Sequence, residues 1–156
     1  MKWMIASDLH GSAYYGKRMV EAFEREGAGR LLLLGDLLYH GPRNDLPRDY
    51  APKEVIPMLN SLKNRLCCVR GNCDAEVDQM VLDFPVLADY CILPAGEKLI
   101  YATHGHIYNL KNLPPLTVHG CGIFLPYLRL SNKIRRPPAS CSCGDCFPSG
   151  CSGSRG

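Results

Sequence analysis

Four short polar clusters contain the residue types that bind divalent metal ions. Carboxylate and amide oxygens and imidazole nitrogens are the ligands that hard and borderline divalent cations prefer. Taken singly, each cluster would be a cap, a turn or a hydrogen-bonded histidine in most proteins. Their joint occurrence predicts a metal site, which is built from Asp8-Leu9-His10, Gly35-Asp36, Gly71-Asn72-Cys73-Asp74 and His104-Gly105-His106.

The chemistry that these residues predict is hydrolysis of a phosphate ester at a pair of metal ions. The spacing of two between Asp8 and His10 places both side chains on one face of an extended segment. The two oxygens of Asp36 can bridge two ions, and Asn72 offers a neutral amide oxygen. Two ions about 3.5–4 Å apart would bind the phosphoryl oxygens and activate a bridging water, whose hydroxide then attacks phosphorus.

Each polar cluster follows a segment that is expected to form a strand. Helical patterns separate the apolar runs, and this alternation predicts an α/β domain with a largely parallel sheet. In such sheets, binding sites form just beyond the carboxyl ends of the strands. The expected strands span residues 2–7, 30–34, 66–69 and 98–103, and the expected helices span residues 14–26, 53–63 and 75–82.

The charge of the chain is nearly balanced up to residue 119 and becomes basic after it. Residues 1–119 hold 13 Lys and Arg against 14 Asp and Glu, whereas residues 120–156 hold five basic residues and one acid. The net charge of +3 is too small to indicate a nucleic-acid or membrane-surface partner. Because no cleavable leader pattern follows Met1, we expect a cytoplasmic protein whose nine Cys are thiols or metal ligands.

The order of the clusters resembles that of the calcineurin-like metallophosphoesterases and, more narrowly, of the bacterial YfcE-type phosphodiesterases. This resemblance implies an α/β sandwich in which helices flank mixed β-sheets, and a phosphoric diester hydrolase that acts on a small phosphodiester. It also implies two divalent ions, of which Mn²⁺ is the expected one. The similarity covers about residues 1–115, with the closest stretches at residues 6–12, 34–44, 69–80 and 103–106.

The resemblance also implies a role for each polar residue at the metal site. Asp8 and His10 would bind the first ion, Asp36 would bridge both, and the second ion would be bound by Asn72 and His104.

Cys73 occupies the place at which many relatives carry a His that can protonate the leaving group or contact the phosphate. A neutral thiol, with a reference pKa of about 8.5, is a poor acid at neutral pH. This substitution favours diesters and activated leaving groups over alkyl monoesters. The catalytic residues implied are therefore Asn72, Cys73 and His104.

Substrate contacts are expected from Cys73 and from the loop that follows Asp36. Arg43 suits phosphate binding through its planar guanidinium, although a solvated loop Arg is an equal alternative. His40 is the second candidate in this loop, and His106 is expected beside the ligands or facing solvent.

The resemblance ends near residue 116. The family carries a Gly-His-x-His motif shortly after His-Gly-His, and it supplies one His to each metal ion; His119-Gly120-Cys121-Gly122 is not that motif. We therefore expect a metallophosphoesterase core over residues 1–116, a non-matching basic and apolar segment over 117–136, and a disordered Pro/Ser/Gly/Cys-rich tail over 137–156. The closing strands of the family would be missing or replaced, as a shifted reading frame or a truncated gene would produce.

Two alternatives to an active diesterase stay open. The first is a catalytically impaired remnant of the family, because each ion would lose one protein ligand. The second is a Cys-rich interaction module that holds zinc through four thiolates, although the spacing is tighter than in known zinc ribbons. The thiolates would come from Cys141, Cys143, Cys146 and Cys151.

Overall fold

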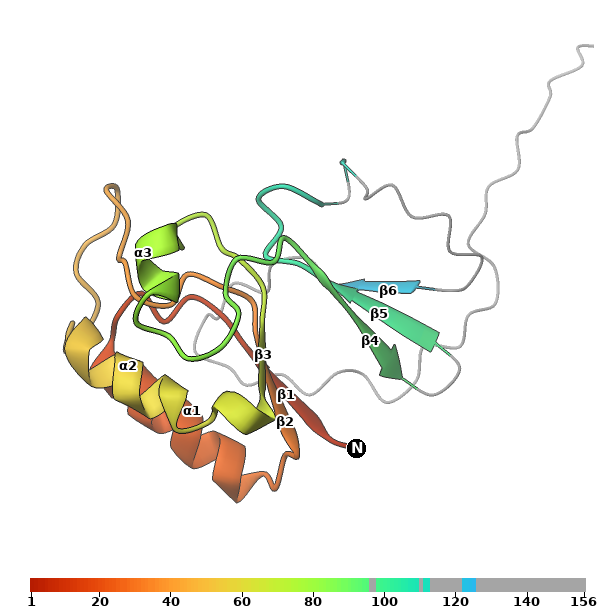
Figure 1. Ribbon diagram of the computed structural model, residues 1–156, viewed down its shortest axis with the longest axis horizontal. Helices are drawn as coiled ribbons and strands as arrows, with labels where there is room; N and C mark the ends of the chain where they lie inside the picture. Colours follow the sequence, from red (N-terminus) through yellow and green to blue (C-terminus); the bar gives the residue numbers. More distant parts are fainter. Residues whose placement is uncertain (96–97, 110, 113–121, 126–156) are drawn as a thin grey trace, which may run out of the picture.

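The computed structural model describes residues 1–95, 98–109, 111–112 and 122–125 (Figure 1). Among these residues, no helix has the length and apolar character that a bilayer span requires. The tail expected over 137–156, with its four Cys, lies outside the described residues. The elements are β1 (Trp3–Ala6), α1 (Ala13–Arg25), β2 (Arg30–Leu33), α2 (Pro52–Asn60), a 3-10 turn (Lys63–Arg65), β3 (Leu66–Cys68), α3 (Glu76–Gln79), β4 (Cys91–Ala95), β5 (Lys98–Ala102) and β6 (Gly122–Leu125).

Two three-stranded sheets form the centre of the protein. The first has the order β1-β2-β3 and is parallel throughout, with Ile5 opposite Leu32 and Leu33 opposite Cys68. The second has the order β4-β5-β6, in which β4 runs antiparallel and β6 parallel to β5. The prediction of an α/β sandwich with mixed sheets is confirmed, and only one of the two sheets is purely parallel.

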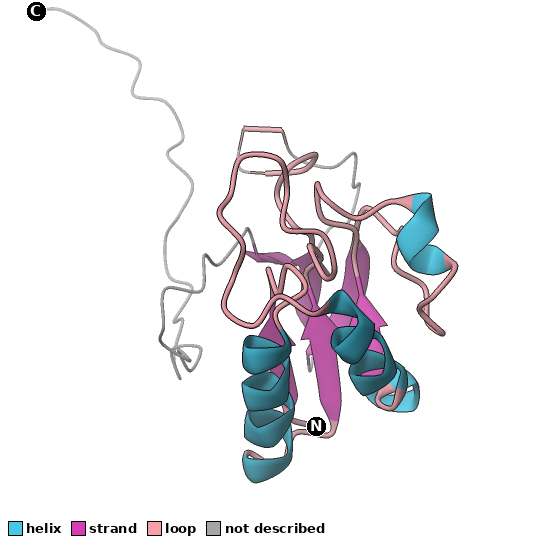
Figure 2. Cartoon of the chain, turned by 90° about the vertical axis from the view of Figure 1, so that its left-hand side faces the viewer, coloured by secondary structure: helices cyan, strands magenta, loops and turns pink. Residues whose placement is uncertain are grey.

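The two helices α1 and α2 lie side by side over one face of the parallel sheet, and the second sheet lies beyond its other face (Figures 1 and 2). The leucine run of β2 therefore meets a core on each side. Leu31 and Leu33 pack into the core under the helices, whereas Leu32 and Leu34 pack into the core between the sheets. None of the four is more than 1% exposed, which explains why the run from Leu31 to Leu34 has no polar position.

Strand β4 is not among the strands expected from the sequence. It contains Pro94, which cannot donate a hydrogen bond to a neighbouring strand. Because β4 lies at the edge of its sheet, only one of its sides has to pair, and the proline is tolerated there.

The helix expected over residues 75–82 is shorter in the structure, where α3 spans Glu76–Gln79. The side chain of Gln79 replaces further helical hydrogen bonds. Its Nε2 donates to the carbonyls of Leu82 (3.1 Å) and Phe84 (2.9 Å), and its Oε1 accepts from the N–H of Val86 (3.0 Å). The amide of Gln79 thus fixes the chain in a turn that leads toward β4.

Candidate metal centre

The loops after β1, β2 and β3 approach each other at one edge of the parallel sheet. The approach is closest between Gly35 and Gly71, where a Cβ on Gly35 would lie 2.1 Å from the backbone nitrogen of Gly71. A Cβ on Gly71 would lie 2.1 Å from Oδ1 of Asp36. Glycine is therefore required at both positions to bring the loops of Asp36 and Asn72 together.

Asp36 lies between two histidine rings. Its Oδ2 is 3.6 Å from Nε2 of His10 and 3.7 Å from Nε2 of His104. Nε2 of His10 is also 3.5 Å from Oδ1 of Asp8, and Nε2 of His104 is 3.0 Å from Oδ1 of Asn72. The structure thus gathers all five predicted metal ligands around one carboxylate.

Two overlapping groups of ligand atoms share Asp36. Within each group, all ligand atoms lie within 4.8 Å of one another. A carboxylate common to both groups is what a bridging ligand requires. One group consists of Asp8, Asp36 and His104, and the other consists of His10, Asp36 and Cys73.

The histidine rings are oriented for metal binding by backbone carbonyls. Nδ1 of His10 lies 2.7 Å from the carbonyl oxygen of Tyr39, and Nδ1 of His104 lies 2.7 Å from that of Leu34. A carbonyl only accepts, so each Nδ1 carries the proton and each Nε2 turns toward Asp36. This arrangement of a ligating His on a carbonyl is typical of metal sites.

Two further observations fit a cation at this place. Oδ2 of Asp8 is buried and has no hydrogen-bond partner among the described residues. The 3.0 Å between Nε2 of His104 and Oδ1 of Asn72 is the separation of two neighbouring ligands that are each about 2.1 Å from one ion. The residues therefore fit the divalent metal ions of the resemblance.

Three of the five predicted ligands have a left-handed backbone. The φ angles are 59° at Asp8, 47° at His10 and 57° at Asp36, in a region that few residues other than glycine adopt. Such a conformation costs on the order of 1–3 kcal/mol at each residue and is typical of functional sites. Hydrogen bonds between the loops maintain it, since the N–H groups of Asp8 and His10 donate to the carbonyls of Gly35 (3.0 Å) and Asp36 (2.9 Å).

Asp74 holds the loop of Asp36 from behind, a role that the sequence did not reveal. Its buried Oδ2 accepts from the N–H groups of Asp36 (2.8 Å) and Gly71 (2.7 Å), and its Oδ1 accepts from that of Leu37 (2.9 Å). The N–H of Cys73 donates to Oδ1 of Asp36 at 2.8 Å. An acid two residues after Asn72, in a turn that begins with glycine, was the available signal.

The electrostatics of the site are those of a place for positive charge. The interaction with Asp8 raises the pKa of His10 to about 9, and the Tyr39 carbonyl and Asp36 add to this effect while burial opposes it. Burial raises the pKa of Asp8, but the interactions with His10, Ser7 and His104 together outweigh burial, and the pKa lies below its usual value. Burial and then Asp36 raise the pKa of the Cys73 thiol to about 11. A bound cation would lower the pKa of all three groups, which is opposite to the shifts of His10 and Cys73 and the same direction as the shift of Asp8.

The other predicted residues lie around this centre. Arg43 is exposed and forms no hydrogen bond or ion pair within the described part of the chain. The His40 ring lies edge-on to Tyr39 and Tyr50, with ring centres 4.9 Å and 5.2 Å away. His106 is exposed and its ring centre is 5.3 Å from that of His104. The substrate contacts of His40 and Arg43 remain predictions.

Comparison with known proteins agrees with this geometry. The family model described as Calcineurin-like phosphoesterase matches residues 1–142. Phosphodiesterase YfcE from Escherichia coli strains K12 and O157:H7 is 47% identical over 116 residues, which are 74% of this chain and 63% of the relative. The solved structure of Yfce, a phosphoesterase from E. coli, superimposes with a TM-score of 0.72 over 74% of this chain and 64% of that chain.

The chain thus spans less than two thirds of the length of the curated relatives it matches. Within that span it has the fold, the glycine-bounded loops and the ligand geometry derived above. The chain belongs to the calcineurin-like phosphoesterase family.

Proposed function

We propose that this chain is a metal-dependent phosphodiesterase that hydrolyses a small phosphodiester with a hydroxide activated by two divalent ions. The single observation that carries the proposal is the convergence of two carbonyl-anchored histidines on Asp36. The similarity to a protein named Phosphodiesterase YfcE supports the choice of diesters.

The five side chains around Asp36 would hold the ions, and we propose Mn²⁺ because carboxylate and amide oxygens outnumber imidazole nitrogens in this set. Such ions, when bound, neutralise the phosphoryl oxygens and lower the pKa of a shared water. The ligands of the first ion would be Asp8 and His10, those of the second would be Asn72 and His104, and Asp36 would bridge the two.

The rest of the machinery keeps the bridging carboxylate in place. Cys73 engages Oδ1 of Asp36 through its N–H, so that Oδ2 faces both imidazoles. Asp74 binds the backbone on either side of that carboxylate and prevents the loop from relaxing. His40 and Arg43 are proposed substrate contacts, since their loop follows Asp36 directly.

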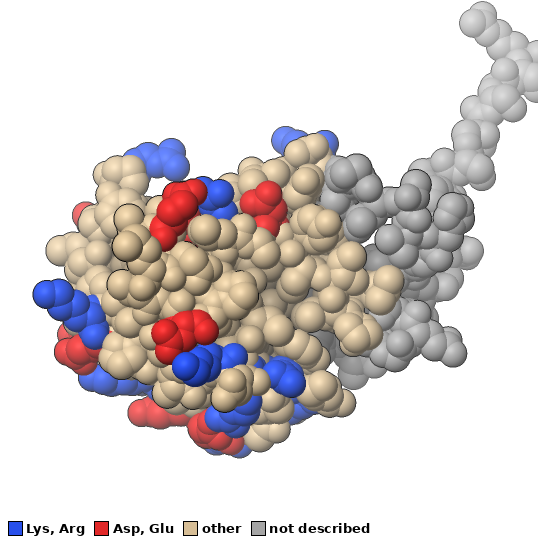
Figure 3. Space-filling model, in the orientation of Figure 1, with Lys and Arg blue, Asp and Glu red and all other residues tan. Residues whose placement is uncertain are grey.

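We propose a small molecule as the substrate because charges of both signs are interspersed on the surface. In Figure 3, Lys and Arg residues lie among Asp and Glu residues on the face that is shown. Several of them form ion pairs, such as Lys63 with Asp83 (2.9 Å) and Lys17 with Glu54 (3.0 Å). This pattern provides no continuous basic track for a nucleic-acid backbone on that face.

The proposal is tested by metal reconstitution of the full chain. After treatment with a chelator, the protein is supplied with Mn²⁺, and bound metal and hydrolysis of bis(p-nitrophenyl) phosphate are both measured. We expect turnover that requires Mn²⁺ and that Asp36→Asn abolishes. Absence of turnover in a chain that binds two ions would reject the proposal.

That last outcome is the expectation for a second candidate, a metal-binding but catalytically impaired member of the family. The observation that favours it is in the sequence, where His119 is the only His after His106 and no Gly-His-x-His occurs. Each ion would then rely on the ligands gathered around Asp36.

A further inference from the structure

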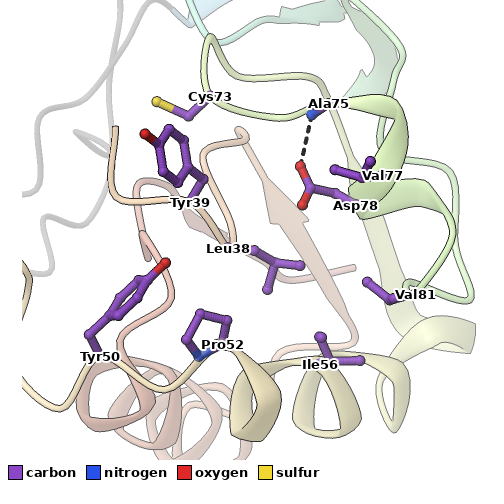
Figure 4. Close-up of a pocket in the computed structure, with 10 residues that line it drawn as sticks. All are labelled: Leu38, Tyr39, Tyr50, Pro52, Ile56, Cys73, Ala75, Val77, Asp78 and Val81. Carbon is purple, nitrogen blue, oxygen red and sulfur yellow. Dashed lines mark hydrogen bonds between the residues drawn. The ribbon is translucent and has the colours of Figure 1, made fainter. Parts of the chain in front are cut away.

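A shallow groove of about 400 Å³ lies beside the metal centre (Figure 4). It runs between the loop after β2, the start of α2 and the segment around α3. Its walls are mostly aliphatic and aromatic. The lining residues are Leu38, Tyr39, Tyr50, Pro52, Ile56, Cys73, Ala75, Val77, Asp78 and Val81.

One end of the groove is part of the metal centre. Cys73 lines the groove, and its Sγ belongs to the ligand group that includes His10 and Asp36. Tyr39 also lines the groove, and its carbonyl oxygen anchors Nδ1 of His10 at 2.7 Å. In Figure 4, Cys73 and Tyr39 lie together at one end, whereas Ile56 and Val81 lie at the other. A molecule bound at the metal ions would therefore reach the groove directly.

The far end of the groove has apolar side chains that the core does not use. Val77 is 66% exposed and Val81 is 42% exposed, although both line the groove. Ile56 and Leu38 also belong to the apolar lining of the groove. Contiguous apolar groups left in contact with water beside a catalytic site indicate a place for an apolar ligand.

The polar side chains that line the groove are few, namely Tyr39, Tyr50, Cys73 and Asp78. Asp78 is buried, and its Oδ2 accepts a hydrogen bond from the N–H of Ala75 at 2.8 Å, drawn as a dashed line in Figure 4. No Lys or Arg lines the groove, so it has no charge complementary to a phosphate. An apolar cavity of about 150 Å³ accommodates benzene. The groove is therefore large enough for one aromatic ring or a short alkyl chain.

We infer that this groove binds an aryl or alkyl ester arm of the phosphodiester whose phosphate lies at the metal ions. A diester has two organic groups on phosphorus, and one of them can occupy the groove while the other points elsewhere. Val77 and Val81 would then determine specificity by covering the apolar arm. This inference rests on the proposed function for the position of the phosphate.

The test compares two unreactive diesters that differ only in their arms. Binding of diphenyl phosphate and of dimethyl phosphate to the Mn²⁺-loaded full chain is measured by isothermal titration calorimetry. We expect diphenyl phosphate to bind about tenfold more tightly, because one ring leaves water. Val77→Asn and Val81→Asn should each weaken diphenyl phosphate severalfold and leave dimethyl phosphate unchanged.

Met80 provides the matched control. It is 84% exposed, lies between the two valines in sequence and does not line the groove, so Met80→Asn should alter neither affinity. All three positions are exposed, so these variants are expected to fold. Equal affinities of the two esters for the wild-type chain would overturn the inference. So would valine variants that bind diphenyl phosphate as the wild type does.

Turnover of bis(p-nitrophenyl) phosphate, measured in parallel, separates the two proposals. If the chain prefers diphenyl phosphate but does not hydrolyse the diester, the groove inference is supported and the proposed activity is rejected. If the chain hydrolyses the diester but binds both unreactive esters equally, the proposed activity is supported and the groove inference is rejected.

Discussion

The loops that follow all three strands of the β1-β2-β3 sheet enter the candidate metal centre, whereas among the described residues the β4-β5-β6 sheet brings one predicted ligand to it, His104. The loops of the first sheet bond to one another through backbone groups, as in the bond from Asp8 N–H to the Gly35 carbonyl. His104 arrives by a different route, because its position depends on how the sheets pack. The candidate centre therefore combines loops that are joined by backbone hydrogen bonds with His104, whose position depends on the packing of the two sheets.

Within the described residues, the contact between the two sheets is mainly apolar, and the imidazole of His104 adds polar contacts to it. Leu32, Leu34 and Val69 of the first sheet pack with Leu93 and Ala102 of the second. The carbonyl of Leu34 also holds Nδ1 of His104 at 2.7 Å. Packing sets the approximate distance, and this hydrogen bond sets the orientation of the imidazole.

The largest loss of metal affinity is expected at Asp36, which lies between His10 of the first sheet's loops and His104 of the second sheet. Asp36→Asn removes the negative charge that lies between His10 and His104, and we expect metal affinity to fall by more than about 100-fold, beyond the range for residues behind the ligands. Calorimetric titration with Mn²⁺ measures this. Asp83→Asn is the control, since Asp83 pairs with Lys63 on the surface. Unchanged affinity in Asp36→Asn would remove Asp36 from the centre.

A smaller side chain in the core between the two sheets tests whether the packing of the sheets positions His104. Leu34→Ala should lower the free energy of unfolding by about 2–5 kcal/mol, because Leu34 is 1% exposed and leaves a cavity between the sheets. Chemical denaturation measures it, with the exposed Leu46→Ala as control. If the sheets are coupled as described, metal affinity also falls, because His104 loses its fixed position. A loss of stability with full metal affinity would show that His104 is held independently.

A substitution at Asp74 weakens the hydrogen bonds between the loops after β2 and β3 without replacing a predicted metal ligand. In Asp74→Asn, one of three backbone N–H groups faces an amide nitrogen instead of an oxygen, so the loop of Asp36 loses support. We expect a loss of about 10–100-fold in metal affinity, as for other residues that orient ligands. Asp74→Glu serves as a second variant that keeps the charge and moves it. An affinity equal to that of the wild type in both variants would contradict the role assigned to Asp74.

Cys73, in the loop after β3, is expected to determine whether diesters or monoesters are hydrolysed faster. Cys73→His introduces a group that can protonate a leaving group, so hydrolysis of p-nitrophenyl phosphate should gain about tenfold or more relative to bis(p-nitrophenyl) phosphate. Steady-state rates for both esters give the ratio, and Cys73→Ser controls for loss of the thiol. The same ratio in the wild type and in Cys73→His would reject the explanation of diester preference.

The smallest effect is expected at Asp78, a carboxylate in α3 outside both sheets. Burial raises its pKa, so the folded protein binds the proton more tightly than the unfolded chain does. Stability from this group is therefore lost as pH rises above about 3.8, and Asp78→Asn should gain a little stability above that pH and none below it. Thermal unfolding at pH 3 and pH 6 measures the difference. Metal affinity should stay unchanged, which separates this acid from those of the centre.

Much of the centre was predictable because each ligand follows a strand that has a strong local signal. The run Leu31–Leu34 leads directly to Asp36, and the run ending at Val69 leads to Asn72. Strand β4 escaped prediction because Pro94 opposes strand formation wherever a partner lies on both sides. The position of β4 at the edge of its sheet depends on tertiary structure and cannot be predicted from the local sequence.

The left-handed backbone at Asp8 and His10 could not be predicted either, because no local sequence pattern indicates it. It arises from hydrogen bonds to the loop of Asp36, which is distant in sequence. The groove could not be predicted either, because Leu38, Ile56 and Val81 come from three segments and share no periodicity.

The left-handed ligands also bear on how this protein can change over evolutionary time. At Asp8, His10 and Asp36, glycine would relieve the backbone and would remove a chemical group at the same mutational step. Selection for persistence of the fold and selection for chemistry therefore act on the same three codons in opposite directions. A lineage released from the need for this site would therefore gain stability by replacing the three residues with glycine.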